Sequence, residues 1–490
     1  MDSPLFKHVL KASGWVSLLA VLGGTLWIGL QGLSRSLWLD EAWVANSVRA
    51  ATLGDMFWRS DWLQTSPPLF LLAARAAIRI FGLSTETLRS VPLVFALISA
   101  GALIAAARRV APSFAMLAGA ALIFPAISLE YFLSFKQYGC EAAAAALILA
   151  ALSFYIVEPR LGFVPLFCVV FFAAGLSYSS IFLLPGVLLA VYRTEGKRHT
   201  LTLAAGSGIA FALLYFLFIQ PNVEPSLWQY WRGGFSEAYT PGVWVWIGGT
   251  AALTLYALRS PATGRQHLLR QHLLLACLLP GILLVIAELT GWYPASPRTR
   301  LFIRPCFILA VAMVLEDFAG RAWRWAPVAA NLAALIVVMF ALPIRLLPLE
   351  DYPPAIAYLR EHVGPNDLLL VHPDALEGFR LYSAMAHWDP PMHAGSTGWP
   401  CCPRGSSTHP DFGPSSEARV DADLARKISP DFSGRVWLFY ANRPLHWKYI
   451  GLDEGDLWRR RVWDRGCPPV EYIALPNLVI APMQCGAKSP

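Results

Sequence analysis

The sequence predicts a polytopic membrane protein, with an all-α membrane domain over residues 1–349 followed by a small α/β soluble domain over residues 350–490. Hydrophobic residues make up 56% of the 490 positions and charged residues only 14%; an average soluble protein has about 25% charged residues. About eleven apolar runs before residue 350 are long enough to cross a bilayer as helices. From residue 351 onward the apolar runs become short and alternate with polar segments, as in a soluble α/β fold.

Each expected span contains roughly 20 mostly apolar residues. The spans are 15–33, 87–107, 113–132, 139–157, two short helices within 161–192, 200–219, 242–258, 273–289, 305–319 and 326–343. The run 161–192 is uncharged but too long for one span, and residues 175–180 (Gly-Leu-Ser-Tyr-Ser-Ser) offer a break in it. No small-residue cleavage site follows the uncharged run 15–33, which indicates a retained span rather than a cleaved signal peptide.

Lysine and arginine cluster between alternate spans, and this pattern predicts the orientation of the chain. Residues 1–349 carry 25 Lys and Arg against 15 Asp and Glu, whereas residues 350–490 carry 14 against 17. A cytoplasmic N-terminus places the basic clusters in cytoplasmic segments that are mostly short, as the positive-inside rule requires. An odd number of spans then makes the C-terminal domain extracytoplasmic. We therefore expect a multi-pass protein of the inner (plasma) membrane and no nucleic-acid partner.

The segments outside the spans carry further local signals. The first outer loop, residues 34–86, contains two segments that are apolar on one side, 42–58 and 67–81, and such segments tend to lie along the membrane interface. In the C-terminal domain we expect a helix at 354–363 and strands at 368–372, 435–440 and 472–480. Four cysteines lie in this domain, and an oxidising compartment predicts at least one disulfide among Cys401, Cys402, Cys467 and Cys485.

Asp40 and Glu41 form an adjacent acidic pair just after the first span. Two carboxylates at a bilayer surface are difficult to keep ionised and dry, so they usually have a partner or a task. The alternative is structural, because Asp40 could cap the helix that follows it. Two carboxylates without a histidine offer too few ligands to bind a metal ion well, so we expect neither a metal nor another cofactor.

Further polar motifs follow on the same expected face. They are Asp61 and Gln64 ahead of Pro67-Pro68-Leu69, Phe81-Gly82 with Glu86 and Leu88-Arg89, Lys136-Gln137-Tyr138, and Tyr293-Pro294 with Arg298, Arg300 and Arg304. Together with the acidic pair, this order of motifs resembles the class C glycosyltransferases, in the bacterial branch related to protein O-mannosyltransferases and lipid A aminoarabinose transferases. The resemblance covers residues 15–345, with one departure: Ser134 stands two positions before the lysine, where an acidic residue is expected.

The resemblance implies that a sugar moves from a polyprenyl-phosphate donor to an acceptor hydroxyl on the extracytoplasmic face. Such an enzyme must deprotonate the acceptor and stabilise the charge that gathers on the leaving phosphate. The candidate base is Asp40, with Glu41 as the alternative. The candidate phosphate ligands are Lys136, Arg298 and Arg300. Secondary candidates for substrate binding are Tyr138, Asp61, Gln64, Arg89 and Arg304.

The implied partners are the lipid bilayer, a polyprenyl-phosphate-linked sugar and an acceptor, and the sequence specifies neither the sugar nor the acceptor. For each cation the alternative is an ordinary interfacial anchor. For the whole chain the alternatives are a transporter or flippase for lipid-linked glycans and a non-catalytic envelope assembly protein. Transporter folds usually show repeated halves and charged or broken spans at the bilayer midplane. We find no internal repeat, and the conspicuous charges lie at the expected outer surface.

Overall fold

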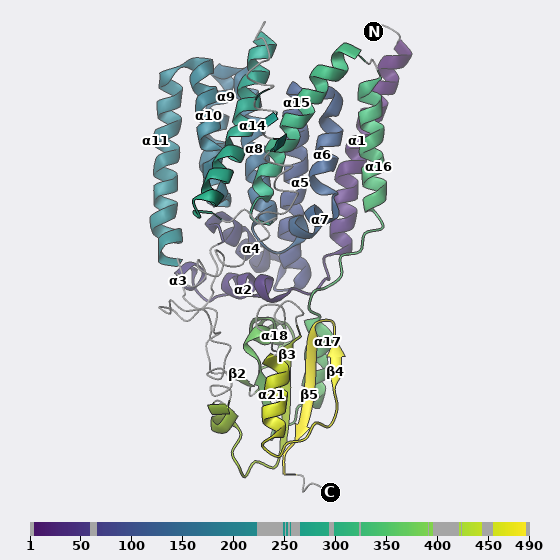
Figure 1. The fold of residues 1–490 in the computed structure, drawn as a ribbon, viewed down its shortest axis with the longest axis vertical. Helices are drawn as coiled ribbons and strands as arrows, with labels where there is room; N and C mark the ends of the chain where they lie inside the picture. The colour runs from purple at the N-terminus through teal and green to yellow at the C-terminus, as the bar shows by residue number, and fades with distance from the viewer. Residues whose placement is uncertain are drawn as a thin grey trace.

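A computed structural model describes residues 4–58, 66–222, 248–249, 251–252, 255, 265–293, 298–322, 325–390, 392–394, 421–422, 424–442 and 454–486. Its helices form a bundle, and a smaller body of sheet and helices lies beneath one end of that bundle (Figure 1). The N-terminus is at the far end of the bundle, and the C-terminus belongs to the smaller body. The expected mostly helical chain with a small mixed sheet is therefore confirmed, and the division at residue 350 stays a prediction.

The long helices run side by side along the bundle (Figure 1). They are α1 (Pro4–Gln31), α5 (Thr85–Val110), α6 (Ala115–Ile123), α8 (Tyr138–Val157), α9 (Pro159–Leu176), α10 (Leu184–Glu195), α11 (Lys197–Leu214), α14 (Arg265–Leu289), α15 (Arg304–Ala322) and α16 (Ala326–Ala341). Within the described ranges, six helices are long and apolar enough to span a membrane, or up to seven with one bent pair. Most of the expected span 242–258 lies outside those ranges, and the count of eleven spans stays a prediction.

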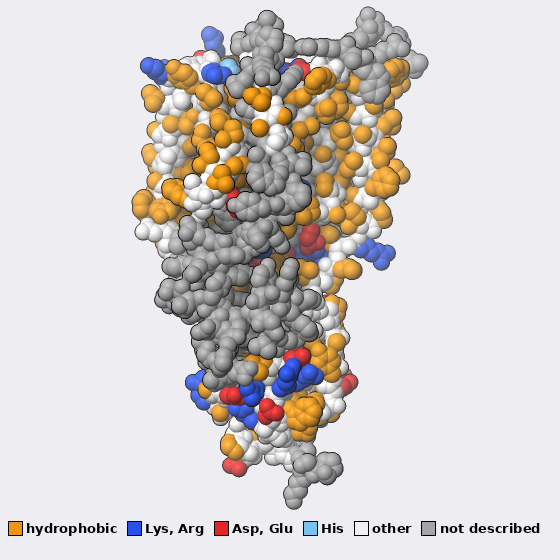
Figure 2. Space-filling model, viewed as in Figure 1, with side chains coloured by type: hydrophobic (Ala, Val, Ile, Leu, Met, Phe, Trp, Pro, Cys, Tyr) orange, Lys and Arg blue, Asp and Glu red, His pale blue; other side chains and the backbone are white. Residues whose placement is uncertain are grey.

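The surface of the bundle is apolar. Figure 2 shows hydrophobic side chains over the visible face of the helical part, with Lys and Arg gathered at its upper end. Large side chains such as Leu19 and Trp27 of α1, Leu161 of α9 and Phe340 of α16 are more than half exposed. Because helices satisfy their own backbone hydrogen bonds, an apolar exterior of this kind suits a lipid environment.

The expected span 113–132 is not one continuous helix. A short 3₁₀ turn, η2 (Pro112–Phe114), and α6 lead up to Ile123, and α7 (Ala126–Leu133) leaves at an angle of 69°. Pro125 has an extended backbone (φ −55°, ψ 133°) and no N–H, so the helix cannot continue through it. The bend lays α7 across the lower end of the bundle (Figure 1).

Three helices of the first outer loop also lie at this end of the bundle: α2 (Leu39–Val48), α3 (Leu53–Trp58) and α4 (Pro68–Phe81). They agree with the two amphipathic segments expected from the sequence. Arg75 of α4 donates to the carbonyls of Val48, Ala50 and Ala51 at 3.0, 2.8 and 3.1 Å. These carbonyls end or follow α2, so a cation of one helix satisfies the C-terminal end of another.

The smaller body contains a five-stranded mixed sheet of order β2-β1-β3-β5-β4. Its strands are β1 (Leu368–Val371), β2 (Met392–Ala394), β3 (Arg435–Ala441), β4 (Ile473–Leu475) and β5 (Leu478–Gln484). The β1 strand pairs in parallel with β2 and β3, whereas β5 pairs antiparallel with β3 and β4. The expected strands 368–372 and 435–440 correspond to β1 and β3, and the expected helix 354–363 corresponds to α17 (Tyr352–His362).

Helices cover both faces of the sheet. Trp437 and Phe439 of β3 pack in one apolar cluster with α17 and α18 (Pro373–Met385). Leu438 of the same strand packs in another cluster with Trp458 of α21 (Glu454–Trp463). The first cluster continues into α2 and α4 of the membrane part, so the body is docked onto the bundle through a shared apolar core.

The expected single strand 472–480 is wrong, because the chain reverses within it. Residues Pro476 and Asn477 form a two-residue turn between β4 and β5, with Leu475 paired to Leu478. Asn477 has a left-handed backbone (φ 50°), which asparagine tolerates better than most residues. Proline followed by a residue with positive φ is typical of a tight turn.

One disulfide joins Cys467 to Cys485 across 18 residues, which confirms the prediction of at least one bridge. Cys401 and Cys402 lie outside the described residues.

Replacing both Cys467 and Cys485 by serine should destabilise the sheet body by about 3 kcal/mol. Without the crosslink the unfolded chain regains conformational entropy, and for a loop of this length the free energy of unfolding falls by about that amount. The measurement is the thermal unfolding midpoint of the purified protein, with and without a reductant. The exposed Cys168 provides the control, because its replacement by serine should leave the midpoint unchanged. An equal midpoint for the wild type and the double variant would contradict the prediction.

Candidate active site

Four segments that are remote in the sequence meet at the end of the bundle that faces the sheet body. They are the start of α2, the first turns of α5, the 134–137 turn between α7 and α8, and the 298–300 turn before η7 (Leu301–Ile303). Each of them carries residues that the sequence predicts for the site. Their contacts divide these residues into a structural set, which is saturated with hydrogen bonds, and a set with few partners.

Glu41 belongs to the structural set. Its carboxylate is fully buried and forms an ion pair with the buried Arg89 of α5, with Nη2–Oε2 and Nη1–Oε1 distances of 2.8 and 3.1 Å. The backbone N–H groups of Phe135 and Trp38 also donate to it, at 2.6 and 3.2 Å. Both carboxylate oxygens are therefore occupied, which leaves Glu41 poorly placed to accept a proton from a substrate.

Arg89 is equally saturated. Besides its two bonds to Glu41, the guanidinium donates to the carbonyls of Arg35, Ser36 and Leu133 at 2.6, 2.9 and 3.0 Å. All five of its N–H groups are used. This arrangement favours a structural role for Arg89 over substrate binding.

Asp40 lies beside Glu41 in the first turn of α2 but points elsewhere. Trp38 is the N-cap of that helix, and the side chain that accepts from the Trp38 N–H is Glu41, so the alternative of Asp40 as the helix cap is wrong. The Asp40 carboxylate is about a quarter exposed, and its Oδ2 lies 3.5 Å from Nη1 of Arg298. Within the described part of the chain this is its one ion pair. The long distance leaves the carboxylate able to exchange partners.

Lys136 lies near both Asp40 and Arg298. It is half-buried in the 134–137 turn, and its ammonium group has no hydrogen-bond partner among the described residues. Burial lowers the pKa of Lys136, and the nearby Asp40 carboxylate acts in the opposite direction. An anion that reached Asp40 would therefore meet two cations, Lys136 and Arg298, beside one carboxylate.

Two tyrosines connect this cluster to a second pair of cations. Tyr138, at the start of α8, packs edge-on against Tyr131 of α7 with ring centroids 5.7 Å apart. Tyr138 lies close enough to Arg298 and Asp40 to feel their charges, and Tyr131 lies similarly close to Arg300 and Arg304. Burial lowers the pKa of Arg300, which Glu288 opposes. Arg298, Arg300 and Arg304 thus gather around one tyrosine pair.

The sheet body holds the chain just ahead of Asp40. The Tyr382 hydroxyl of α18 accepts from the Leu37 N–H at 2.6 Å, and the buried Glu350 carboxylate accepts from the Leu39 N–H at 3.0 Å. Tyr352 donates through its hydroxyl to the same Glu350 oxygen at 2.9 Å. The start of α2 is therefore fixed from the sheet body as well as from the membrane part.

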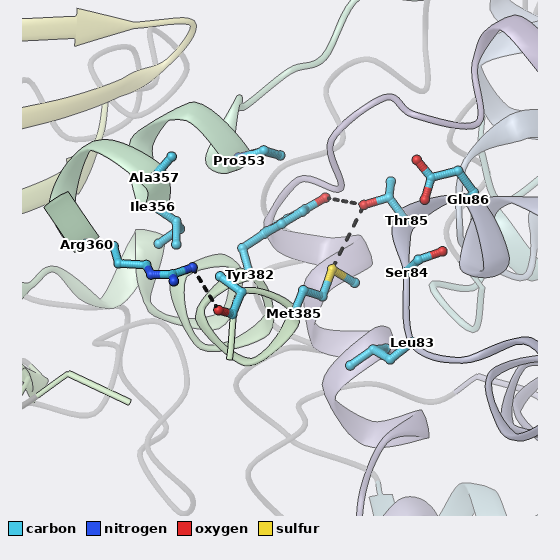
Figure 3. Close-up of a pocket in the computed structure, with 11 residues that line it drawn as sticks. Leu83, Ser84, Thr85, Glu86, Pro353, Ile356, Ala357, Arg360, Tyr382 and Met385 are labelled. Atoms are coloured by element: carbon cyan, nitrogen blue, oxygen red, sulfur yellow. Dashed lines mark hydrogen bonds between the residues drawn. The ribbon is translucent and has the colours of Figure 1, made fainter. Parts of the chain in front are cut away.

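A cavity of about 350 Å³ adjoins this junction (Figure 3). Ser84, Thr85 and Glu86 line it from the start of α5, and Arg360 and Tyr382 line it from α17 and α18. None of the sequence-predicted site residues lines it. Thr85 contacts the Tyr382 hydroxyl at 3.3 Å. The cavity therefore borders the hydrogen bond between Tyr382 and the Leu37 N–H, and not Asp40 or the cations.

Three polar residues near the site were not singled out from the sequence: Glu130, Arg35 and Glu141. Glu130 of α7 forms an ion pair with Arg35 at 2.7 Å, and Ser134, noted from the sequence, donates to the Glu130 carbonyl at 2.6 Å. Glu141 is a buried carboxyl in the first turn of α8. A signal for Glu141 was present, because an ionisable residue within an apolar span is a functional candidate by default.

Two of the sequence-predicted residues, Asp61 and Gln64, lie outside the described residues. No group of three or more His, Cys, Asp or Glu side chains that could hold a metal ion lies among the described ones. The expectation that no metal or other cofactor is required stays a prediction.

No family model matches this chain, and no curated protein matches it. Solved structures do match. ArnT from Cupriavidus metallidurans, crystallised with undecaprenyl phosphate, has a TM-score of 0.51 at 14% sequence identity, over 98% of this chain and 100% of that one. The arabinofuranosyltransferase AftD from Mycobacteria has a TM-score of 0.51 at 15% identity, over 98% of this chain and 40% of that one. At these identities the likeness shows a shared fold, which confirms at that level the resemblance to class C glycosyltransferases.

The replacement Arg89→Met should lower the stability by about 3–5 kcal/mol, because it leaves the Glu41 carboxylate buried without its cation. The measurement is the thermal unfolding midpoint of the purified protein in detergent. Arg345→Met is the matched control, because Arg345 is exposed and its loss should change little. An Arg89→Met variant that unfolds at the wild-type temperature would contradict the structural role of the pair.

Proposed function

We propose that this chain is a membrane glycosyltransferase that moves a sugar from a polyprenyl-phosphate donor to an acceptor hydroxyl on the extracytoplasmic face. The observation that carries the proposal is the grouping of Asp40 with Arg298 and Lys136, in a fold shared with an ArnT structure that holds undecaprenyl phosphate. A carboxylate beside two cations supplies a base and an anion site in one place.

In the proposed reaction Asp40 takes the proton of the acceptor hydroxyl. The acceptor oxygen forms a bond to the anomeric carbon while the bond from that carbon to the phosphate oxygen breaks, and the electron pair leaves with the polyprenyl phosphate. Arg298, Lys136 and Arg300 bind the phosphate and stabilise the charge that it gains. Because the donor is already activated, the site needs no further chemical group for this step.

The Asp40–Arg298 contact suits an exchange of partners. At 3.5 Å and about a quarter exposed on each side, this ion pair contributes little stability. A phosphate that takes over the Arg298 guanidinium would release Asp40 to accept a proton. Glu41 cannot be released in this way, since Arg89 and two backbone N–H groups hold it. We therefore assign the base to Asp40.

Asp40→Asn should lower the turnover by on the order of a hundredfold or more while donor binding persists, because the amide keeps the size of the carboxylate but cannot accept the proton. The measurement is the transfer of radiolabelled sugar from a polyprenyl phosphate to extracted envelope lipids, with donor affinity measured in parallel. Normal turnover by a correctly inserted Asp40→Asn variant would refute the assignment.

Arg298→Ala should weaken donor binding as well as turnover, because the phosphate is anionic in both the ground state and the transition state. A roughly tenfold to hundredfold loss of affinity is the scale of one charge-assisted hydrogen bond. The exposed Arg345 again offers a matched control, since an interfacial anchor of that kind should leave donor affinity unchanged when it becomes alanine. Equal effects of the two replacements would indicate that Arg298 is only an anchor.

The proposed orientation has a separate test. Reporter fusions after Arg109 and Arg198 should give a cytoplasmic signal, and a fusion after Pro490 should give an extracytoplasmic one, because the basic clusters favour the cytoplasm. The sheet body contacts the start of α2, so both lie on the same side of the membrane. A cytoplasmic signal at Pro490 would therefore place Asp40 and Glu41 on the cytoplasmic side, away from an extracytoplasmic donor.

A further inference from the structure

The 298–300 turn carries two of the candidate phosphate ligands, and η7 holds it at its downstream end. All three residues of η7 are buried. The Leu301 N–H donates to the Arg298 carbonyl at 3.4 Å, and the Ile303 N–H donates to the Arg300 carbonyl at 3.2 Å. Buried apolar side chains and these short-range bonds fix the chain after Arg300. A second contact holds the turn from the upstream side.

That contact comes from Tyr293, which stands directly after the end of α14. Gly291 has a left-handed backbone (φ 70°), and its N–H donates to the Glu288 carbonyl at 3.0 Å. The Trp292 N–H donates to the Ala287 carbonyl at 2.7 Å. These two bonds form the Schellman pattern that ends a helix, in which glycine is the usual left-handed residue. The backbone that carries Tyr293 is therefore fixed by the helix end.

The Tyr293 side chain reaches from this helix end to the turn. Its ring packs edge-on against Phe182 and Phe302, with centroids 5.3 and 6.4 Å apart. Its hydroxyl donates to the Thr299 carbonyl at 3.0 Å. Because this bond uses the one proton of the hydroxyl, the buried Ser179 hydroxyl, 3.1 Å away, donates to the tyrosine oxygen. A bond donated to a hydroxyl polarises it and strengthens the bond that it donates in turn.

Thr299 follows Arg298 directly, and Arg298 lies 3.5 Å from Asp40. We propose that Tyr293 is a positioning residue, which holds Arg298 beside Asp40 by fixing the Thr299 carbonyl, with Ser179 as its support. The functional part of this inference rests on the proposed function, because it gives Arg298 a donor phosphate to bind. The alternative is a purely packing role, in which phenylalanine at position 293 would serve equally well.

Hydrogen exchange of the purified protein tests the hold without any substrate. Tyr293→Phe keeps the ring and removes the bond to Thr299. A peptide covering residues 298–303 should then exchange about five- to tenfold faster, the scale of one hydrogen bond, while exchange in α14 stays as in the wild type. Ser179→Ala should give a smaller increase in the same peptide.

Tyr192→Phe is the matched control, because Tyr192 is exposed on α10 and its replacement should leave the 298–303 peptide unchanged. Wild-type exchange of this peptide in Tyr293→Phe overturns the hold. Wild-type exchange in Ser179→Ala contradicts the supporting role of Ser179.

Binding of a polyprenyl phosphate, the carrier released in the proposed reaction, tests the consequence. Tyr293→Phe should weaken this binding about five- to tenfold, whereas Tyr192→Phe should not. If the Tyr293 hydroxyl acts through Arg298, the two replacements are not additive. In an Arg298→Ala background, Tyr293→Phe should therefore change the affinity by less than about twofold.

Unchanged affinity in folded Tyr293→Phe, or a full effect of Tyr293→Phe in the Arg298→Ala background, overturns the positioning role. A wild type that binds no polyprenyl phosphate refutes the proposed function instead, and hydrogen exchange still decides whether Tyr293 holds the turn.

Discussion

The buried ion pair of Glu41 and Arg89 is the interaction on which the geometry of the site depends. Removing two charges from water is unfavourable by several kcal/mol per ion unless nearly every donor and acceptor is satisfied. Here the five N–H groups of Arg89 all donate, and both oxygens of Glu41 accept. The pair joins α2, α5, the segment before α2 and the turn between α7 and α8. Since neighbouring residues of a helix point about 100° apart, fixing Glu41 on the inside leaves Asp40 directed towards the cations.

The sheet body completes this constraint from the other side. Tyr382 and Glu350 accept from the backbone of residues 37 and 39, while Tyr352 donates its N–H to the Ser36 hydroxyl at 3.2 Å. The segment that carries the candidate base is thus held by residues more than 300 positions further along the chain. This arrangement gives the C-terminal part a role in positioning the site, separate from any binding role of its own.

The sequence predicted the elements better than it predicted their interactions. Apolar runs and basic clusters indicated most helices, and the break within 161–192 corresponds to the 3₁₀ turn η3 (Tyr178–Phe182) between α9 and α10. The turn at Pro476 was missed because apolar residues continue on both sides of the Pro-Asn pair, so the run resembles a single strand. At the site, Asp40, Lys136, Arg298 and Tyr138 are brought together as expected. The saturation of Glu41 by Arg89 depends on tertiary contacts between distant segments, which no local pattern encodes.

The balance of charge around Asp40 explains why this arrangement suits a lipid-phosphate sugar. Arg89 neutralises Glu41, and Arg35 neutralises Glu130, so neither carboxylate opposes an incoming anion. Lys136 and Arg298 outnumber the Asp40 carboxylate, so this cluster favours an anion such as a phosphodiester. An anionic phosphate acts on Lys136 in the same direction as Asp40, so donor binding would favour the protonated ammonium despite its partial burial. In the proposed reaction, the departing phosphate gains a second negative charge when its bond to the sugar breaks, while Asp40 becomes neutral as it accepts the acceptor's proton. Both changes strengthen the attraction between the phosphate and its cations in the transition state relative to the ground state, which is the condition for catalysis.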